Sequence, residues 1–193
     1  FRAREGSPAG SMIYFVNQIA KSFPNKTIST LAYQYTRKPP LTKPESNVLI
    51  TLCSIECDRS IPIDEGCKDF QSDLIGWSKL TENIRIWDYT TQFTNFLAPF
   101  PNWGTIKPNI NLFVNNNAKW IFEQHSNNPS ELFELRSYLM AKLLWDPNLD
   151  SNLVIKDFTN GYYGQGGIYI AKYIEEIQNQ LNNPKPFFLF LYG

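Results

Sequence analysis

Apolar positions along the chain follow two spacings, a period near 3.6 that is typical of helices and short runs that are typical of buried strands. The runs predict four strands, at residues 27–35, 48–53, 84–89 and 120–123. The helical spacing predicts helices at residues 12–21, 70–77 and 109–116. Three more helices close the chain. The first is capped by Ser130 and has a buried stripe of Leu132, Leu135, Leu139 and Leu143, the second is capped by Asp150 or Ser151, and the third has a stripe of Ile170, Ile174, Ile177 and Leu181.

Strands that alternate with helices predict a parallel α/β sheet. Polar and aromatic residues gather just after each predicted strand, and α/β sheets and barrels bind ligands outside the carboxyl ends of their strands. Four such strand ends fit half of a (β/α)8 barrel. The glycine-rich run at 161–167 follows no predicted strand, so we interpret it as a turn that breaks a helix and not as a phosphate-binding loop.

Composition narrows the classes of partner. The chain has 18 basic and 18 acidic residues and no formal net charge, which removes the electrostatic argument for binding nucleic acid or an anionic membrane. It has no apolar run long enough to span a bilayer. Aromatic residues make up 15% of the chain, and such residues form the stacking walls of ligand pockets as well as cores.

Asp88 and Glu123 are the candidate catalytic residues, because each lies at the end of a predicted strand. Two carboxylates that flank a glycosidic bond can act as acid and base, or as acid and nucleophile. The alternative is that each carboxylate pairs with an arginine or caps a loop. Side chains near the other strand ends are candidates for substrate binding, either by stacking on a sugar or by hydrogen bonding: Tyr33, Tyr35, Glu56, Asp58, Arg59, Trp87, Tyr89, Trp103 and His125.

Arg59, beside two carboxylates, could bind a substrate carboxylate through parallel hydrogen bonds, or it could form a local salt bridge. The three cysteines, Cys53, Cys57 and Cys67, do not have the spacing of a usual structural zinc site, and an odd number does not indicate a disulfide framework. One disulfide together with one free thiol remains an alternative. We expect no metal and no cofactor.

Several blocks, taken in order, resemble the bacterial domain of unknown function numbered 4838. They lie at residues 6–11, 31–40, 53–60, 76–77, 86–89, 99–103, 143–150 and 161–164. That family is similar to glycoside hydrolases, and the block at 143–150 also resembles a segment of the family 67 α-glucuronidases. The resemblance implies a (β/α)8 barrel, of which residues 1–193 would be the C-terminal half: a single domain of four parallel strands and a helical end.

The same resemblance implies an enzyme that hydrolyses glycosidic bonds, with acidic sugars among its substrates. It places the general acid in the missing N-terminal half, whereas Asp88 and Glu123 match a later carboxylate pair by strand order alone. We expect the full-length protein to be secreted or periplasmic. The second hypothesis is a barrel that binds carbohydrate without catalysis, and the third is a metal-binding domain that uses the cysteines. An apolar run at 187–192 suggests that the chain continues beyond its last residue.

Overall fold

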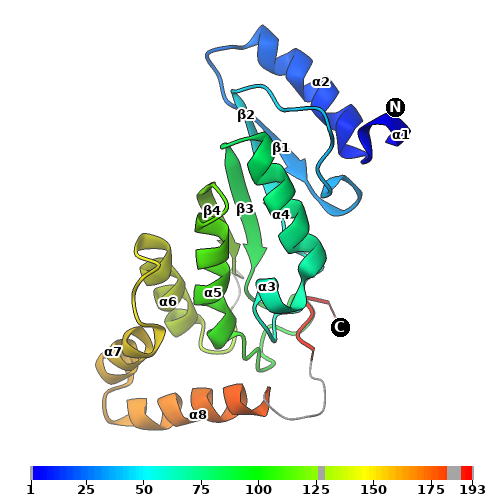
Figure 1. Cartoon of the computed structure of the whole chain (residues 1–193). Coiled ribbons are helices and arrows are strands. Elements are labelled where there is room, and N and C mark those ends of the chain that lie inside the picture. The colour runs from blue at the N-terminus through cyan, green and yellow to red at the C-terminus, as the bar shows by residue number, and fades with distance from the viewer. Residues whose placement is uncertain (1, 126–128, 182–187, 193) are drawn as a thin grey trace. The chain divides into compact units, whose positions relative to one another are not determined.

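The computed structural model describes residues 2–125, 129–181 and 188–192 (Figure 1). The chain divides into two compact units. The first comprises residues 1–57, 67–88 and 112–122, and the second comprises residues 58–66, 89–111 and 123–193.

The helices and strands follow the predicted alternation. The strands are β1 (Ile28–Ala32), β2 (Val48–Cys53), β3 (Ile84–Tyr89) and β4 (Ala118–Gln124). The α-helices are α1 (Arg2–Glu5), α2 (Ala9–Ser22), α3 (Ile63–Gly66), α4 (Lys68–Leu80), α5 (Trp103–Val114), α6 (Phe133–Trp145), α7 (Ser151–Tyr163) and α8 (Gly167–Gln180). Two short 3-10 helices, η1 (Gln34–Thr36) and η2 (Gly164–Gly166), lie between them.

Four parallel strands form one sheet in the order β1-β2-β3-β4, which confirms the predicted α/β class. In the register, Leu31 lies opposite Thr51, and Thr51 lies opposite Arg85. Each strand therefore neighbours the next strand in the sequence. This order is the one that right-handed βαβ crossovers produce when a sheet grows in one direction.

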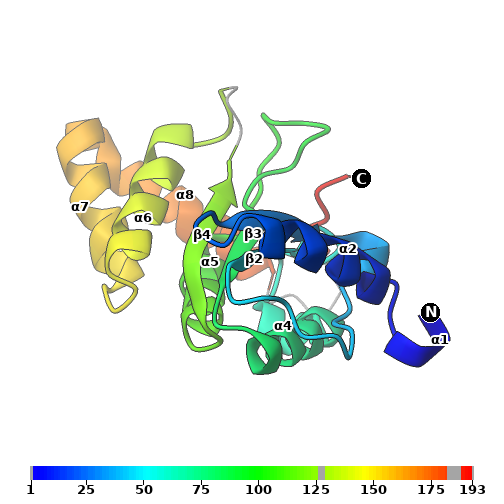
Figure 2. The ribbon, with the colours of Figure 1, turned by 90° about the horizontal axis from the view of Figure 1, so that it is seen from above.

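The two faces of the sheet differ sharply. Because side chains alternate along a strand, Ala32, Ile50, Leu52, Ile84 and Ile86 share one face, and all of them are 0% exposed. Helix α4 lies on one side of the strands in both views (Figures 1 and 2) and buries Phe70, Leu74 and Trp77. The opposite face of the sheet, which we call the open face, leaves large apolar side chains in contact with solvent.

In the second unit, α7 packs against both α6 and α8. Helix α7 begins where it was predicted, because Asp150 Oδ1 accepts hydrogen bonds from the backbone N–H groups of Asn152 and Leu153 at 2.8 and 3.2 Å. The run at 161–167 ends α7 and forms η2, so its interpretation as a helix-breaking turn is confirmed.

Several predicted element boundaries are wrong, among them the start of α5, which lies at Trp103 and not at residue 109. Strand β1 ends at Ala32 and not at Tyr35, because Tyr33 begins a tight turn in which its N–H donates to Thr36 Oγ1 at 3.2 Å and Gln34 takes a φ of 48°. Ser130 does not cap α6. The chain reverses at Leu132 with a φ of 49°, so the helix starts at Phe133 and Leu132 precedes its buried stripe.

Candidate functional site

In the first unit, Ser54 and Asp88 meet at the carboxyl ends of β2 and β3. Ser54 is 0% exposed and Asp88 is 3% exposed, and the serine hydroxyl donates a hydrogen bond to Asp88 Oδ1. By strand alternation Asp88 shares the covered face with Ile84 and Ile86. The buried carboxylate is therefore held by a hydroxyl on the helix side of the sheet.

The open face carries the neighbouring side chain, Trp87. Its ring contacts Phe122 of β4 edge to face, with centroids 5.2 Å apart. Arg85 lies on the same face, where its Nε donates to Thr51 Oγ1 at 3.1 Å and its Nη2 donates to Ser29 Oγ at 3.0 Å. One arginine therefore spans three strands through hydroxyl groups. Nothing in the sequence singles out Arg85, because its position on this face depends on the register of three strands.

Glu56 forms a salt bridge with Arg37, with an Oε2–Nη1 distance of 2.9 Å. The Nε of the same guanidinium donates to Asp73 Oδ2 of α4 at 2.8 Å. Burial raises the pKa of Asp73, although its contact with Arg37 acts in the opposite direction. This network joins the turn after β1, the loop after β2 and α4. Glu56 is therefore engaged in a salt bridge within the protein, which is the alternative to a role in substrate binding.

The cysteines resolve into one bridge and one thiol. Cys57 and Cys67 form a disulfide, and Cys53, at the end of β2, is a buried cysteine outside this bridge. Within the described residues, no group of three or more histidine, cysteine or acidic side chains is placed to hold a metal ion.

In the second unit, residues 188–192 hold the segment that carries Asp58 and Arg59. Asp58 Oδ1 accepts a hydrogen bond from the Leu189 N–H at 2.8 Å, and the Arg59 N–H donates to the Leu189 carbonyl at 2.9 Å. Phe93, in the loop after β3, donates its N–H to the Leu191 carbonyl at 2.9 Å. Arg59 is only 1% exposed, so its side chain belongs to the interior of this unit.

Arg136 of α6 is the centre of a second buried cluster, which sequence reasoning missed. Its guanidinium lies 3.9 Å from the centroid of the Trp103 ring and donates to Asn102 Oδ1, to the Phe100 carbonyl at 3.1 Å and to Glu131 Oε2 at 3.1 Å. Burial is the main reason that the pKa of Arg136 falls to about 10, and the charge of Glu131 opposes the shift. The only signal in the sequence was an arginine inside an apolar helical stripe.

His125 stacks on Phe133, with ring centroids 4.8 Å apart. Burial lowers the pKa of His125 to about 4, and the positive charge of Arg136 adds to this effect. His125 is therefore neutral at pH 7, a form that can accept a proton but cannot supply a positive charge.

The remaining candidate residues differ in solvent exposure and in the side chains around them. Tyr35 is 78% exposed in η1, and Tyr89 is 6% exposed with its ring edge against Phe93. Tyr33 and Glu123 are half-buried. Asp88 belongs to the first unit and Glu123 to the second. The structure brings Arg85, Trp87 and Phe122 together on the open face, and it gathers Trp103 with Arg136 in the second unit.

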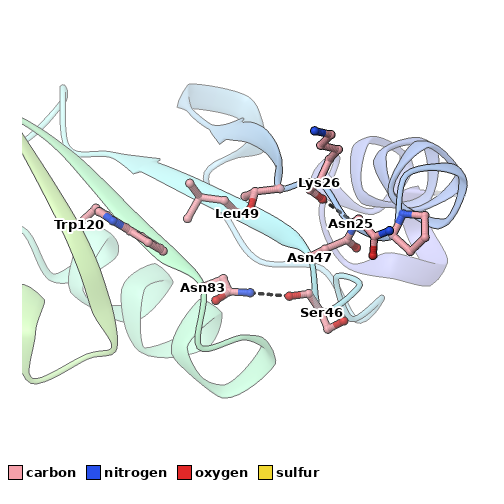
Figure 3. A pocket seen from close by; sticks show the side chains of 9 residues that line it. Asn25, Lys26, Ser46, Asn47, Leu49, Asn83 and Trp120 are labelled. Carbon is pink, nitrogen blue, oxygen red and sulfur yellow. Dashed lines mark hydrogen bonds between the residues drawn. The ribbon is translucent and has the colours of Figure 1, made fainter.

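A cavity of 390 Å³ lies at the amino ends of the strands, away from the predicted residues (Figure 3). Leu49 and Trp120 line it beside asparagine side chains, two of which are already engaged in hydrogen bonds. Asn83 Nδ2 donates to the Ser46 carbonyl at 2.6 Å, and Asn47 Nδ2 donates to the Lys26 carbonyl at 2.9 Å. These amides fix the loops that begin the strands.

A larger cavity of 920 Å³ lies in the second unit among α5, α7 and α8. Ile155, Ala171 and Ile174 line it with amide and charged side chains. Lys107 is partly engaged, because its Nζ donates to the Leu149 carbonyl at 2.7 Å. Its volume lies in the range of small-molecule sites, but none of the candidate residues except Trp103 lines it.

The fold and these strand ends define an α/β protein with a parallel sheet and a helical C-terminal part. The chain belongs to the family described as "Domain of unknown function (DUF4838)", whose model matches residues 2–175. Comparison with curated proteins and with solved structures finds no match. Of the helices that the structure describes, none combines the length and apolar character needed to cross a membrane.

Proposed function

We propose that this chain is the C-terminal half of a (β/α)8 barrel that acts on glycosidic bonds of oligosaccharides or polysaccharides, including those of acidic sugars. One observation carries the proposal: a parallel sheet that buries Ala32, Ile50, Leu52, Ile84 and Ile86 on one face and exposes Trp120 and Phe122 on the other. In a (β/α)8 barrel the helices cover the outer face and the inner face surrounds the site.

The side chains of the open face fit this proposal. Trp87 and Phe122 would offer aromatic surfaces to sugar rings, and a (β/α)8 site takes its residues from the ends of several strands. The block at 143–150, which resembles a segment of the family 67 α-glucuronidases, would favour the same reaction class. The general acid would then lie on the missing N-terminal strands.

In this proposal Asp88, or Glu123 of the second unit, activates the attacking water. Asp88 would reach the site at the rim of the sheet, where β3 ends. The disulfide between Cys57 and Cys67 agrees with secretion or a periplasmic location, because disulfides persist in oxidising compartments.

The test is the Asp88→Asn variant of the full-length protein, with release of reducing sugar from uronic-acid-containing oligosaccharides as the assay. Asp88→Asn should abolish turnover and leave the circular dichroism spectrum unchanged. Ser54→Ala is the matched variant, because it removes the hydrogen-bond donor and keeps the carboxylate. Full activity of Asp88→Asn would remove Asp88 from the catalytic role.

The second candidate function is carbohydrate binding without catalysis, and the position of Asp88 favours it. That carboxylate lies on the covered face and is engaged by Ser54, an arrangement that suits a structural hydrogen bond. In this case glycan binding, measured by calorimetry, survives both Asp88→Asn and Glu123→Gln, and the assay detects no product.

A further inference from the structure

The open face of the sheet holds one positive charge among apolar side chains. Leu31 is 44% exposed, Trp120 is 51% exposed and Phe122 is 47% exposed, and all three lie on the face that carries Arg85. Trp120 and Phe122 adjoin each other on β4, and Leu31 lies at the opposite edge of the same face. Large exposed apolar side chains of this kind mark a surface that is covered in the working protein. Strands β1 and β4 are also the two edges of the sheet, each with a neighbour on one side only among the described residues.

Arg85 indicates what covers this face. Its guanidinium is oriented across the sheet by Ser29 and Thr51, yet both partners are neutral hydroxyls. Among the residues that the structure describes, no carboxylate lies within salt-bridge distance of Arg85. A guanidinium that becomes buried needs an acidic partner, because the cost of desolvating an unpaired charge is several kcal/mol.

A second copy of the chain does not meet this need. Along the open face the side chains are Ser29 and Leu31 on β1, Leu49, Thr51 and Cys53 on β2, Arg85 and Trp87 on β3, and Trp120 and Phe122 on β4. None of them is acidic. Two open faces packed on each other would therefore place two arginines together without a carboxylate.

We propose that the open face is covered by the further strands of the same barrel, and that one of these strands presents an aspartate or glutamate to Arg85. The inference rests on the proposed function, and it adds that the other half of the barrel presents an acidic side chain to this face. The partner strands pair with the free edges of β1 and β4, and their apolar side chains cover Leu31, Trp120 and Phe122. The acidic side chain forms parallel hydrogen bonds with the part of the guanidinium that Ser29 and Thr51 leave unused.

The test compares variants of the full-length protein by thermal unfolding. Arg85→Met should lower the melting temperature by about 5 °C or more, because it leaves the partner carboxylate buried without a counter-charge. Arg85→Lys keeps the charge and should recover part of the loss. The Ser29→Ala/Thr51→Val double variant removes the hydroxyl partners alone and should cost clearly less than Arg85→Met. Lys119→Met, an exposed cation on β4, is the matched control and should leave the melting temperature unchanged.

Two results would overturn the inference. If Arg85→Met lowers the melting temperature no more than the Ser29→Ala/Thr51→Val variant does, Arg85 contributes to stability only through its hydrogen bonds to the two hydroxyl groups. If glucuronate raises the melting temperature of the wild-type protein and fails to raise that of Arg85→Met, a ligand and not a strand supplies the carboxylate. Failure of the proposed function is distinct from both, because a protein without glycan binding or turnover would still lose stability with Arg85→Met.

Discussion

Removal of the disulfide between Cys57 and Cys67 should destabilise the chain by an amount that follows from the loop it closes. The two cysteines are 10 residues apart. The chain-entropy relation then gives an entropy loss in the unfolded state of about 9 cal/mol/K, which corresponds to about 2.7 kcal/mol at 25 °C. For a chain of this length we expect the melting temperature to fall by roughly 5–10 °C.

The assay is urea unfolding of the Cys57→Ala/Cys67→Ala variant, followed by tryptophan fluorescence. Alanine is the chosen substitution because Cys57 is only 1% exposed, and serine would bury an extra hydroxyl. The wild-type protein with a thiol reductant should unfold at the same urea concentration as the variant. Cys53→Ala, which removes the cysteine outside the bridge, is the control. A midpoint unchanged by both treatments would refute the reasoning, because the loop would then be equally restricted without the bridge.

Two further predictions concern the buried cluster of the second unit. Arg136→Met should lower the free energy of unfolding by about 3–5 kcal/mol, because Glu131 then keeps a buried charge without its partner. Glu131→Gln in the same chain should restore most of the loss. Equal free energies for the single and double variants in urea unfolding would contradict this prediction. Burial, together with Arg136, lowers the pKa of His125 from 6.5 to about 4, so its contribution to stability is complete above pH 6.5 and is lost as the pH falls toward 4. The chain has one histidine, so a proton NMR titration reports on it alone, and a midpoint near 6.5 would contradict the prediction.

The class of the fold could be predicted from the sequence because the strands have regular apolar patterns. Strands β2 and β3 occupy the predicted residues, since β2 is a short, almost wholly apolar run and the buried Ile84 and Ile86 of β3 alternate with Arg85 and Trp87. Strand β1 was predicted too long, because Tyr33 and Tyr35 favour a strand by propensity. A hydrogen bond from the Tyr33 N–H to Thr36 Oγ1 decides the local conformation instead, and a pattern of apolar residues contains no information about such a bond.

The candidate site was predictable only in part. Residues near the strand ends could be named, but the face on which each side chain lies depends on where its strand starts. A shift of one residue moves a side chain to the other face, and Asp88 and Trp87 therefore differ completely in environment. Arg85 and Arg136 could not be selected, because both partners of Arg85, and Asn102 and Phe100 around Arg136, lie on segments far away in the sequence.

The hydrogen bond between the Leu189 N–H and Asp58 joins residues that are 131 positions apart. During synthesis, at about 5–20 residues per second, Asp58 is added to the chain roughly 7–26 s before Leu189. Throughout that interval the loop after β2 lacks the backbone partner that it has in the finished protein. This edge of the second unit therefore cannot be completed until residue 189 has been added, long after the residues of β1–β4 have been made.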